Sequence, residues 1–154
     1  MSLRTAWSER LRRLLPGLWA GLLLCIGLVA APAAFALLVP ADAGRLVGRL
    51  LAQEAYASLV VGALLLVLER MAARRGATEA HGTQFSTGMV LALGALFCTV
   101  AGYFGLLQVM AQARLGQGPL SFGQVHAASA VFFAIKTALV LALAWRAGGT
   151  AAQA

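Results

Sequence analysis

Residues 122–145 read FGQVHAASAVFFAIKTALVLALAW, and Lys136 is the only residue among them with a formal charge. Roughly 20 apolar residues suffice for a helix to cross a hydrocarbon core about 30 Å thick. Three further long apolar stretches, residues 14–39, 50–68 and 85–113, fill most of the remaining chain. Because backbone in lipid must satisfy its hydrogen bonds within its own segment, we expect an all-α, integral membrane four-helix bundle.

The charged residues agree with this fold class and predict its orientation. They make up 11% of the chain, whereas globular proteins have about 25%. The arginines outside the spans divide into eight on one side of the expected membrane and three on the other. The eight are Arg4, Arg10, Arg12, Arg13, Arg70, Arg74, Arg75 and Arg146, and the three are Arg45, Arg49 and Arg114. The positive-inside rule therefore predicts an N-in/C-in topology, and the net charge of +7 needs no nucleic-acid partner.

The apolar stretches leave no room for a separate soluble domain. We expect residues 1–13 to form a basic cytoplasmic segment, residues 14–146 the transmembrane domain, and residues 147–154 a flexible C-terminal tail. The alternative for the first stretch is a signal peptide, with residues 34–36 (AFA) as its cleavage site. Its apolar core exceeds the roughly 7–15 residues of a signal peptide, which favours a retained helix.

Small residues at helical spacing predict close packing between helices. Gly17 and Gly21 lie four residues apart in the first span, and Gly94, Cys98 and Gly102 repeat this spacing in the third. Small side chains let helix backbones approach closely in a membrane. We therefore expect all five residues to lie against neighbouring helices.

Two prolines shape the first two spans. Pro32 lies in the outer third of the first span and should kink it, because proline removes a backbone hydrogen bond. Pro40 should end that helix. Arg45 and Arg49 face one way, as in an amphipathic turn lying on the membrane surface. This arrangement predicts that Glu54 lies near the outer end of the second span.

Polar residues inside spans are costly and are the first candidates for a functional site. His126, Ser129 and Lys136 share one face of the last span, within an arc of about 80°. Other polar groups lie toward the outer ends of the second and third spans. We expect a polar cavity that opens outward and is lined by His126, Ser129, Lys136, Glu54, Tyr103 and Gln108.

Lys136 is the most unusual of these residues because it lies near mid-membrane. At a rise of 1.5 Å per residue, Glu54 is expected roughly 11 Å away along the membrane normal. Without an acid at its own depth, Lys136 should be neutral, hydrated through the cavity, or extended toward the cytoplasmic headgroups. For His126, near an interface, the simpler role is to cap or bridge helices.

Metal ligands are few and widely spaced. Cys25 and Cys98 both fall near mid-membrane, and two thiolates can hold Cu(I). However, an isolated cysteine in a packed span usually behaves as a small apolar residue. His126 is the third candidate ligand. No phosphate-binding loop, dinucleotide-binding turn or nucleophile elbow is present, so we expect no cofactor and no enzymatic activity, with haem or copper as the alternative.

Four stretches have a fairly specific combined pattern: residues 18–21 (LWAG), 31–35 (APAAF), 43–50 (AGRLVGRL) and 122–129 (FGQVHAAS). Their order resembles the transmembrane protein 205-like family, whose bacterial members carry a four-helix domain of unknown function. The resemblance implies a multi-pass protein of the bacterial inner membrane. One departure is Ala127, where relatives usually have glycine. The family is distantly similar to copper-resistance proteins and to a haem-using membrane oxidase, which implies the haem or copper alternative.

These observations leave three functions open. The first is a small carrier or accessory protein for a metal ion or small solute. The second is a haem- or copper-binding redox protein, with His126 as an axial ligand supported by Lys136. The third is a structural protein whose partner, besides the lipid bilayer, is a second copy or another membrane protein.

Overall fold

The computed structural model describes residues 3–77 and 86–149. Within these ranges the chain is helical apart from short turns, which confirms the all-α fold. Two π-helices, η1 and η2, interrupt the first and third rods. The elements are α1 (Leu3–Leu24), η1 (Cys25–Ala30), α2 (Ala31–Leu37), α3 (Pro40–Ala77), α4 (Thr87–Thr99), η2 (Val100–Gly105), α5 (Leu106–Arg114) and α6 (Phe122–Gly149).

Four helical rods are long and apolar enough to cross a membrane, as predicted. They are Ala6–Leu37, Pro40–Arg74, Thr87–Arg114 and Phe122–Gly149. In the expected C-terminal tail, α6 continues to Gly149, and residues 150–154 lie outside the described part of the chain. The N-in/C-in orientation remains a prediction.

The second rod begins earlier than expected. α3 starts at Pro40 and runs for 38 residues, so Arg45 and Arg49 lie on this helix rather than on a separate surface turn. Proline is well suited to the first turn of a helix, where an N–H has no intrahelical partner, and the same residue therefore both follows α2 and opens α3. Arg45 then pairs with Asp42 one turn earlier.

The irregularity expected at Pro32 takes the form of a π-helix in the preceding turn. Pro32 has no N–H to donate, so the regular bonding pattern cannot continue through it. The turn widens instead, and the N–H of Ala31 donates to the carbonyl of Ile26, five residues back. π-helical turns of this kind are inserted into α-helices where the regular ladder is interrupted.

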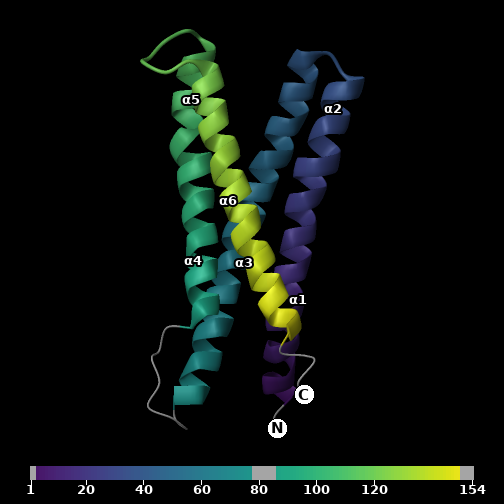
Figure 1. The fold of residues 1–154 in the computed structure, drawn as a ribbon, viewed down its shortest axis with the longest axis vertical. Coiled ribbons are helices and arrows are strands. Elements are labelled where there is room, and N and C mark those ends of the chain that lie inside the picture. Colours follow the sequence, from purple (N-terminus) through teal and green to yellow (C-terminus); the bar gives the residue numbers. More distant parts are fainter. Residues whose placement is uncertain (1–2, 78–85, 150–154) are drawn as a thin grey trace.

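The helices pack tightly at one end of the molecule and separate at the other (Figure 1). At the end that holds both termini, α1, α3, α4 and α6 surround one apolar core. Its buried members are Trp19, Ala20, Leu23, Leu65, Ala92, Ala95, Val140 and Leu143. Toward the opposite end, the rods diverge into two arms.

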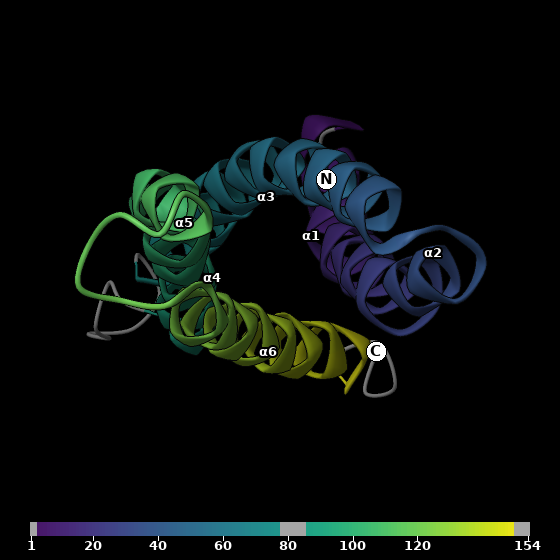
Figure 2. The ribbon, with the colours of Figure 1, turned by 90° about the horizontal axis from the view of Figure 1, so that it is seen from above.

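We define arm one as η1, α2 and the first half of α3, and arm two as η2, α5 and the first half of α6. α2 packs on α3, whereas α5 packs on α6. Viewed from above, α2 and α5 lie on opposite sides of the molecule (Figure 2). Each arm is therefore a pair of rods joined by its own turn, and both arms extend from the common core.

Small residues allow close contacts at several of these helix crossings. A Cβ atom on Gly94 would lie 3.0 Å from Leu139, and one on Gly102 would lie 2.9 Å from Cγ of Phe132. Cys98, between them, is buried. Gly62, which the sequence analysis did not include, is equally close to α4, since its Cβ would lie 2.6 Å from Leu96.

Gly17 and Gly21 do not make the contacts that their spacing led us to expect. Both are exposed, and a Cβ atom at either position would meet nothing within 4 Å. The reason is the rotation of α1, which directs Trp19, Ala20 and Leu23 into the core. The face that carries the two glycines is consequently turned away from the other helices of the chain.

Substitution of Gly102 should destabilise the protein, whereas the same change at Gly21 should not. In Gly102→Ala, the new methyl group would overlap Phe132, and overpacking of this kind costs about 1–3 kcal/mol. Gly21→Ala is the matched control because its methyl group enters open space. Thermal unfolding in detergent, followed by circular dichroism, measures the difference. Equal midpoints for the two variants would show that the contact at Gly102 has no energetic weight.

Candidate intramembrane polar site

Lys136 and Glu54 form an ion pair in the middle of the membrane-spanning region. The ammonium nitrogen of Lys136 lies 2.8 Å from each carboxylate oxygen of Glu54. Their side chains are 4% and 2% exposed, so the pair is almost completely sealed from its surroundings. It joins α3 to α6, and thus arm one to arm two, near the level at which the arms diverge.

A short chain of hydrogen bonds extends the pair to a third helix. The hydroxyl of Ser58, one helical turn after Glu54, donates to Oε1 of that carboxylate. The same hydroxyl accepts a hydrogen bond of 2.8 Å from the indole N–H of Trp19 on α1. Both Ser58 and Trp19 are buried. The site therefore comprises Trp19, Ser58, Glu54 and Lys136, and we call it the polar chain.

Apolar groups enclose the ammonium end of the polar chain. The ring of Phe133, one turn before Lys136, has its centroid 5.1 Å from the ammonium nitrogen. The same ring lies close to Gly27 in η1, where an added Cβ would come within 3.1 Å of it. A cation near an aromatic face gains electrostatic stabilisation, especially where water is excluded. Phe133 thus contributes to both the charge and the closure of the site.

The expected separation of roughly 11 Å between Glu54 and Lys136 was wrong, because it was counted from too late a helix start. α3 begins at Pro40 and α6 begins at Phe122. Glu54 and Lys136 each lie fourteen residues after the first residue of their own helix. Both helices run inward from the same end of the molecule, so the two side chains reach the same depth.

The other four residues of the expected cavity have separate environments. His126 is exposed and stacks on Phe122, with ring centroids 5.8 Å apart. Ser129 donates to the carbonyl of Gly102, in η2, at 3.1 Å. Tyr103 packs edge-on against Phe104, and Gln108 is exposed on α5. Among the six candidates, the described contacts connect only Glu54 with Lys136.

Sequence reasoning missed Ser58 and Trp19, although one of them left a signal. Ser58 follows Glu54 by four residues, so the two side chains share a helical face. A buried carboxylate needs hydrogen-bond donors, and a hydroxyl on the same face is an obvious source. The role of Trp19 had no comparable signal, because its contact depends on how α1 crosses α3.

The candidate metal ligands do not come together in the described residues. Cys25 is exposed and Cys98 is buried, on different rods. No three His, Cys, Asp or Glu side chains of the described chain form a group that could hold a metal ion. His126, the candidate axial ligand, lies on the exposed side of α6.

The pair should behave as one energetic unit. Removing one member, by Lys136→Met or Glu54→Gln, leaves the other charge buried or forces its neutralisation, at a cost of about 3–5 kcal/mol. The double variant leaves no buried charge, so its loss should be smaller than the sum of the two single losses. Unfolding in mixed micelles with increasing dodecyl sulfate measures all four proteins. Additive losses would mean that the two charges are not coupled.

Comparison with known proteins places most of this chain in one group. Residues 14–118 match the model of a domain of unknown function, DUF4149. The matched residues include Trp19, Glu54 and Ser58 but end before α6, which carries Lys136. No curated protein and no solved structure matches the chain.

Proposed function

The chain belongs to this family of domains of unknown function, because the match covers more than half of its residues, and we propose that it acts as a small carrier or accessory protein. The observation that supports this function is the buried Glu54–Lys136 pair. Charged groups inside a membrane are expensive, and they commonly mark the path of an ion, a proton or a polar substrate.

The position of the pair suggests how a cargo would interact with it. Glu54 belongs to arm one and Lys136 lies at the base of arm two, directly after the first half of α6, so movement of the arms apart would separate the two charges. Each group would then need a new partner: a cation or proton for Glu54 and Ser58, and an anion for Lys136. A cargo with such a group stabilises the separated state, which is the requirement for a ligand to shift a conformational equilibrium.

In this proposal the observed structure, in which the two charges are paired, is the closed state of the carrier. The carboxylate is satisfied by Lys136 and Ser58, and the side chain of Ser58 is held by Trp19. Every fully buried side-chain nitrogen and oxygen of the described residues has a partner. A carrier needs a closed state of this kind, because charges left unpaired in lipid would make the cargo-free protein costly to populate.

The structural-partner function predicts a different property of the same pair. A pair that only holds α3 against α6 never has to open.

The redox function depends instead on His126 and on a haem or copper centre. It predicts a visible absorption band in the purified protein that disappears in His126→Ala.

We propose further that the chain is N-in/C-in in a bacterial inner membrane and akin to the transmembrane protein 205-like family.

Carbodiimide labelling of Glu54 should separate the carrier from the purely structural function. Dicyclohexylcarbodiimide partitions into membranes and reacts with protonated carboxyl groups. We expect Glu54 to react slowly in the wild-type protein, because the reagent reaches the carboxyl group only when the ion pair opens. Mass spectrometry of peptides from protein in liposomes locates the adduct, and Glu54→Gln should abolish it.

The reactive control is Lys136→Met, in which the carboxyl group has lost its ionic partner and should react quickly. A wild-type protein that stays unlabelled over hours, under conditions in which Lys136→Met is fully labelled, would show that the pair does not open. The carrier function would then be wrong, and the structural function would replace it.

A further inference from the structure

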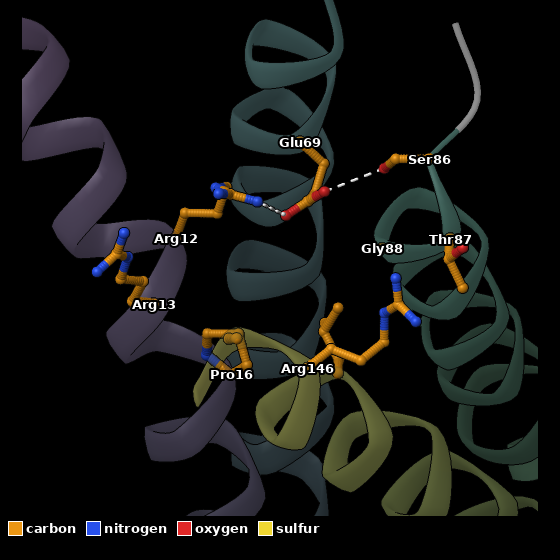
Figure 3. Close-up of a pocket in the computed structure, with 10 residues that line it drawn as sticks. Arg12, Arg13, Pro16, Glu69, Ser86, Thr87, Gly88 and Arg146 are labelled. Carbon is orange, nitrogen blue, oxygen red and sulfur yellow. Dashed lines mark hydrogen bonds and ion pairs between the residues drawn. The ribbon is translucent and has the colours of Figure 1, made fainter. Parts of the chain in front are cut away.

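A second charged site lies at the end of the bundle where α1 begins and α6 ends, and Figure 3 shows its side chains. Residues of α1, α3, α4 and α6 surround a cavity of about 180 Å³ there, several times the roughly 30 Å³ that one water molecule occupies in the liquid. Three arginines, Arg12, Arg13 and Arg146, line this cavity together with one carboxylate, Glu69. We call it the terminal pocket.

Glu69 is already engaged on the wall of the terminal pocket. Arg12 donates to Oε1 at 3.2 Å, and the hydroxyl of Ser86 donates to Oε2 at 3.0 Å. Gly88 leaves room for the carboxylate, because a Cβ there would lie 2.5 Å from Oε2. Arg12 is also held by Glu9. Glu69 thus fixes Arg12 and is neutralised by it.

Arg13 and Arg146 have no such acidic partner among the described residues. Both are exposed at the pocket. The side chain of Arg146 extends from α6 toward Thr87 and Gly88, the first residues of α4 (Figure 3). The N-terminus of α4 already holds an anion, because the Glu69 carboxylate lies against Gly88, and it is capped by the hydroxyl of Ser86, which accepts a hydrogen bond from the N–H of Met89 at 3.2 Å. Arg146 is therefore the group on this side of the pocket that can bind a further anion.

The charges of the terminal pocket favour an anion with several oxygen atoms. Three arginines and one glutamate line the pocket, and Arg12 is the one that pairs with Glu69, so the positive charges of Arg13 and Arg146 have no acid within the lining. The guanidinium of Arg13 is turned away from Glu69 (Figure 3). Arginine binds phosphate through paired, charge-assisted hydrogen bonds. The pocket also lies at the ends of rods Thr87–Arg114 and Phe122–Gly149, where lipid headgroups meet the protein.

We propose that the terminal pocket binds the phosphate group of an anionic phospholipid, held by Arg146, with Arg13 adding positive charge at the edge of the pocket. This inference does not depend on the function proposed for the Glu54–Lys136 pair. Its chemistry is that of any phosphate group, but the position of the pocket at the ends of the apolar rods favours a lipid headgroup over a phosphate ion from solution.

Lipid binding can be measured by the thermal stability of the full-length protein in a neutral detergent. Phosphatidylglycerol and cardiolipin should each raise the melting temperature in a saturable manner, whereas phosphatidylcholine should not. In the double variant Arg13→Gln/Arg146→Gln, the concentration needed for half of the shift should rise at least about tenfold, as expected when charged hydrogen bonds are lost.

The matched control is Arg10→Gln/Arg70→Gln. It removes the same two charges from exposed positions at the same end of the protein, outside the pocket lining. It should keep the wild-type response. Equal weakening in both double variants would overturn the proposal, because it would indicate general attraction to a basic surface. A pocket variant that still responds like the wild type would overturn it as well.

A second arm of the experiment distinguishes the source of the phosphate. Inorganic phosphate at millimolar concentration should leave the melting temperature unchanged. A shift as large as that with phosphatidylglycerol, lost in the pocket variant, would overturn the lipid assignment in favour of a soluble phosphate. Size-exclusion profiles of both double variants, compared with the wild type, establish that each remains folded before its response is measured.

Discussion

A charge in the hydrocarbon core must have a partner, and the arrangement of the helices follows from how Lys136 obtains one. Contact with both oxygens of Glu54 allows little sliding between α3 and α6, because one residue of slip moves a side chain by 1.5 Å and about 100° around the axis. Ser58 and Trp19 impose the same restriction on α1. Apolar contacts discriminate weakly between registers in lipid, which is itself apolar. The hydrogen bonds of the polar chain therefore fix the register of these three helices more strictly than their apolar contacts do.

The polar chain also marks a boundary between two kinds of packing. On the side of the termini, four rods enclose a continuous apolar core. On the other side, each arm is only two rods wide, and both arms contain a π-helix, η1 or η2, near the base. A π-helical turn interrupts the regular backbone hydrogen bonding, and Ser129 of α6 donates to the carbonyl of Gly102 within η2. The irregular turns thus lie where the rods leave the shared core, which is where a change in direction of an arm would have to originate.

Composition and length were sufficient to predict four spanning helices, because the cost of unpaired backbone in lipid allows few alternatives. The partner of Lys136 could not be predicted while Pro40 was interpreted only as a helix end, since that interpretation placed Glu54 near the surface. The spacing of the glycines did not determine which of them contact another helix. Gly17 and Gly21 share a face just as Gly94 and Gly102 do, but the spacing does not say which face of a helix meets its neighbours. The same missing rotation explains why His126 and Lys136, assigned to one arc, differ so much in burial.

The two charged sites use similar residues under opposite constraints. At mid-membrane, Lys136 and Glu54 neutralise each other and are sealed from their surroundings, because a surplus charge there would be expensive. At the terminal pocket, water and headgroups reduce that cost, so Arg13 and Arg146 can remain without an acidic partner in the described chain. These two arginines also belong to the group of eight that predicts the orientation. The same arginines therefore serve two purposes. They contribute to the charge bias that predicts the topology, and they provide the excess positive charge that suits a phosphate group. Inverting the orientation of the chain would move the pocket to the opposite leaflet and change which headgroups it meets.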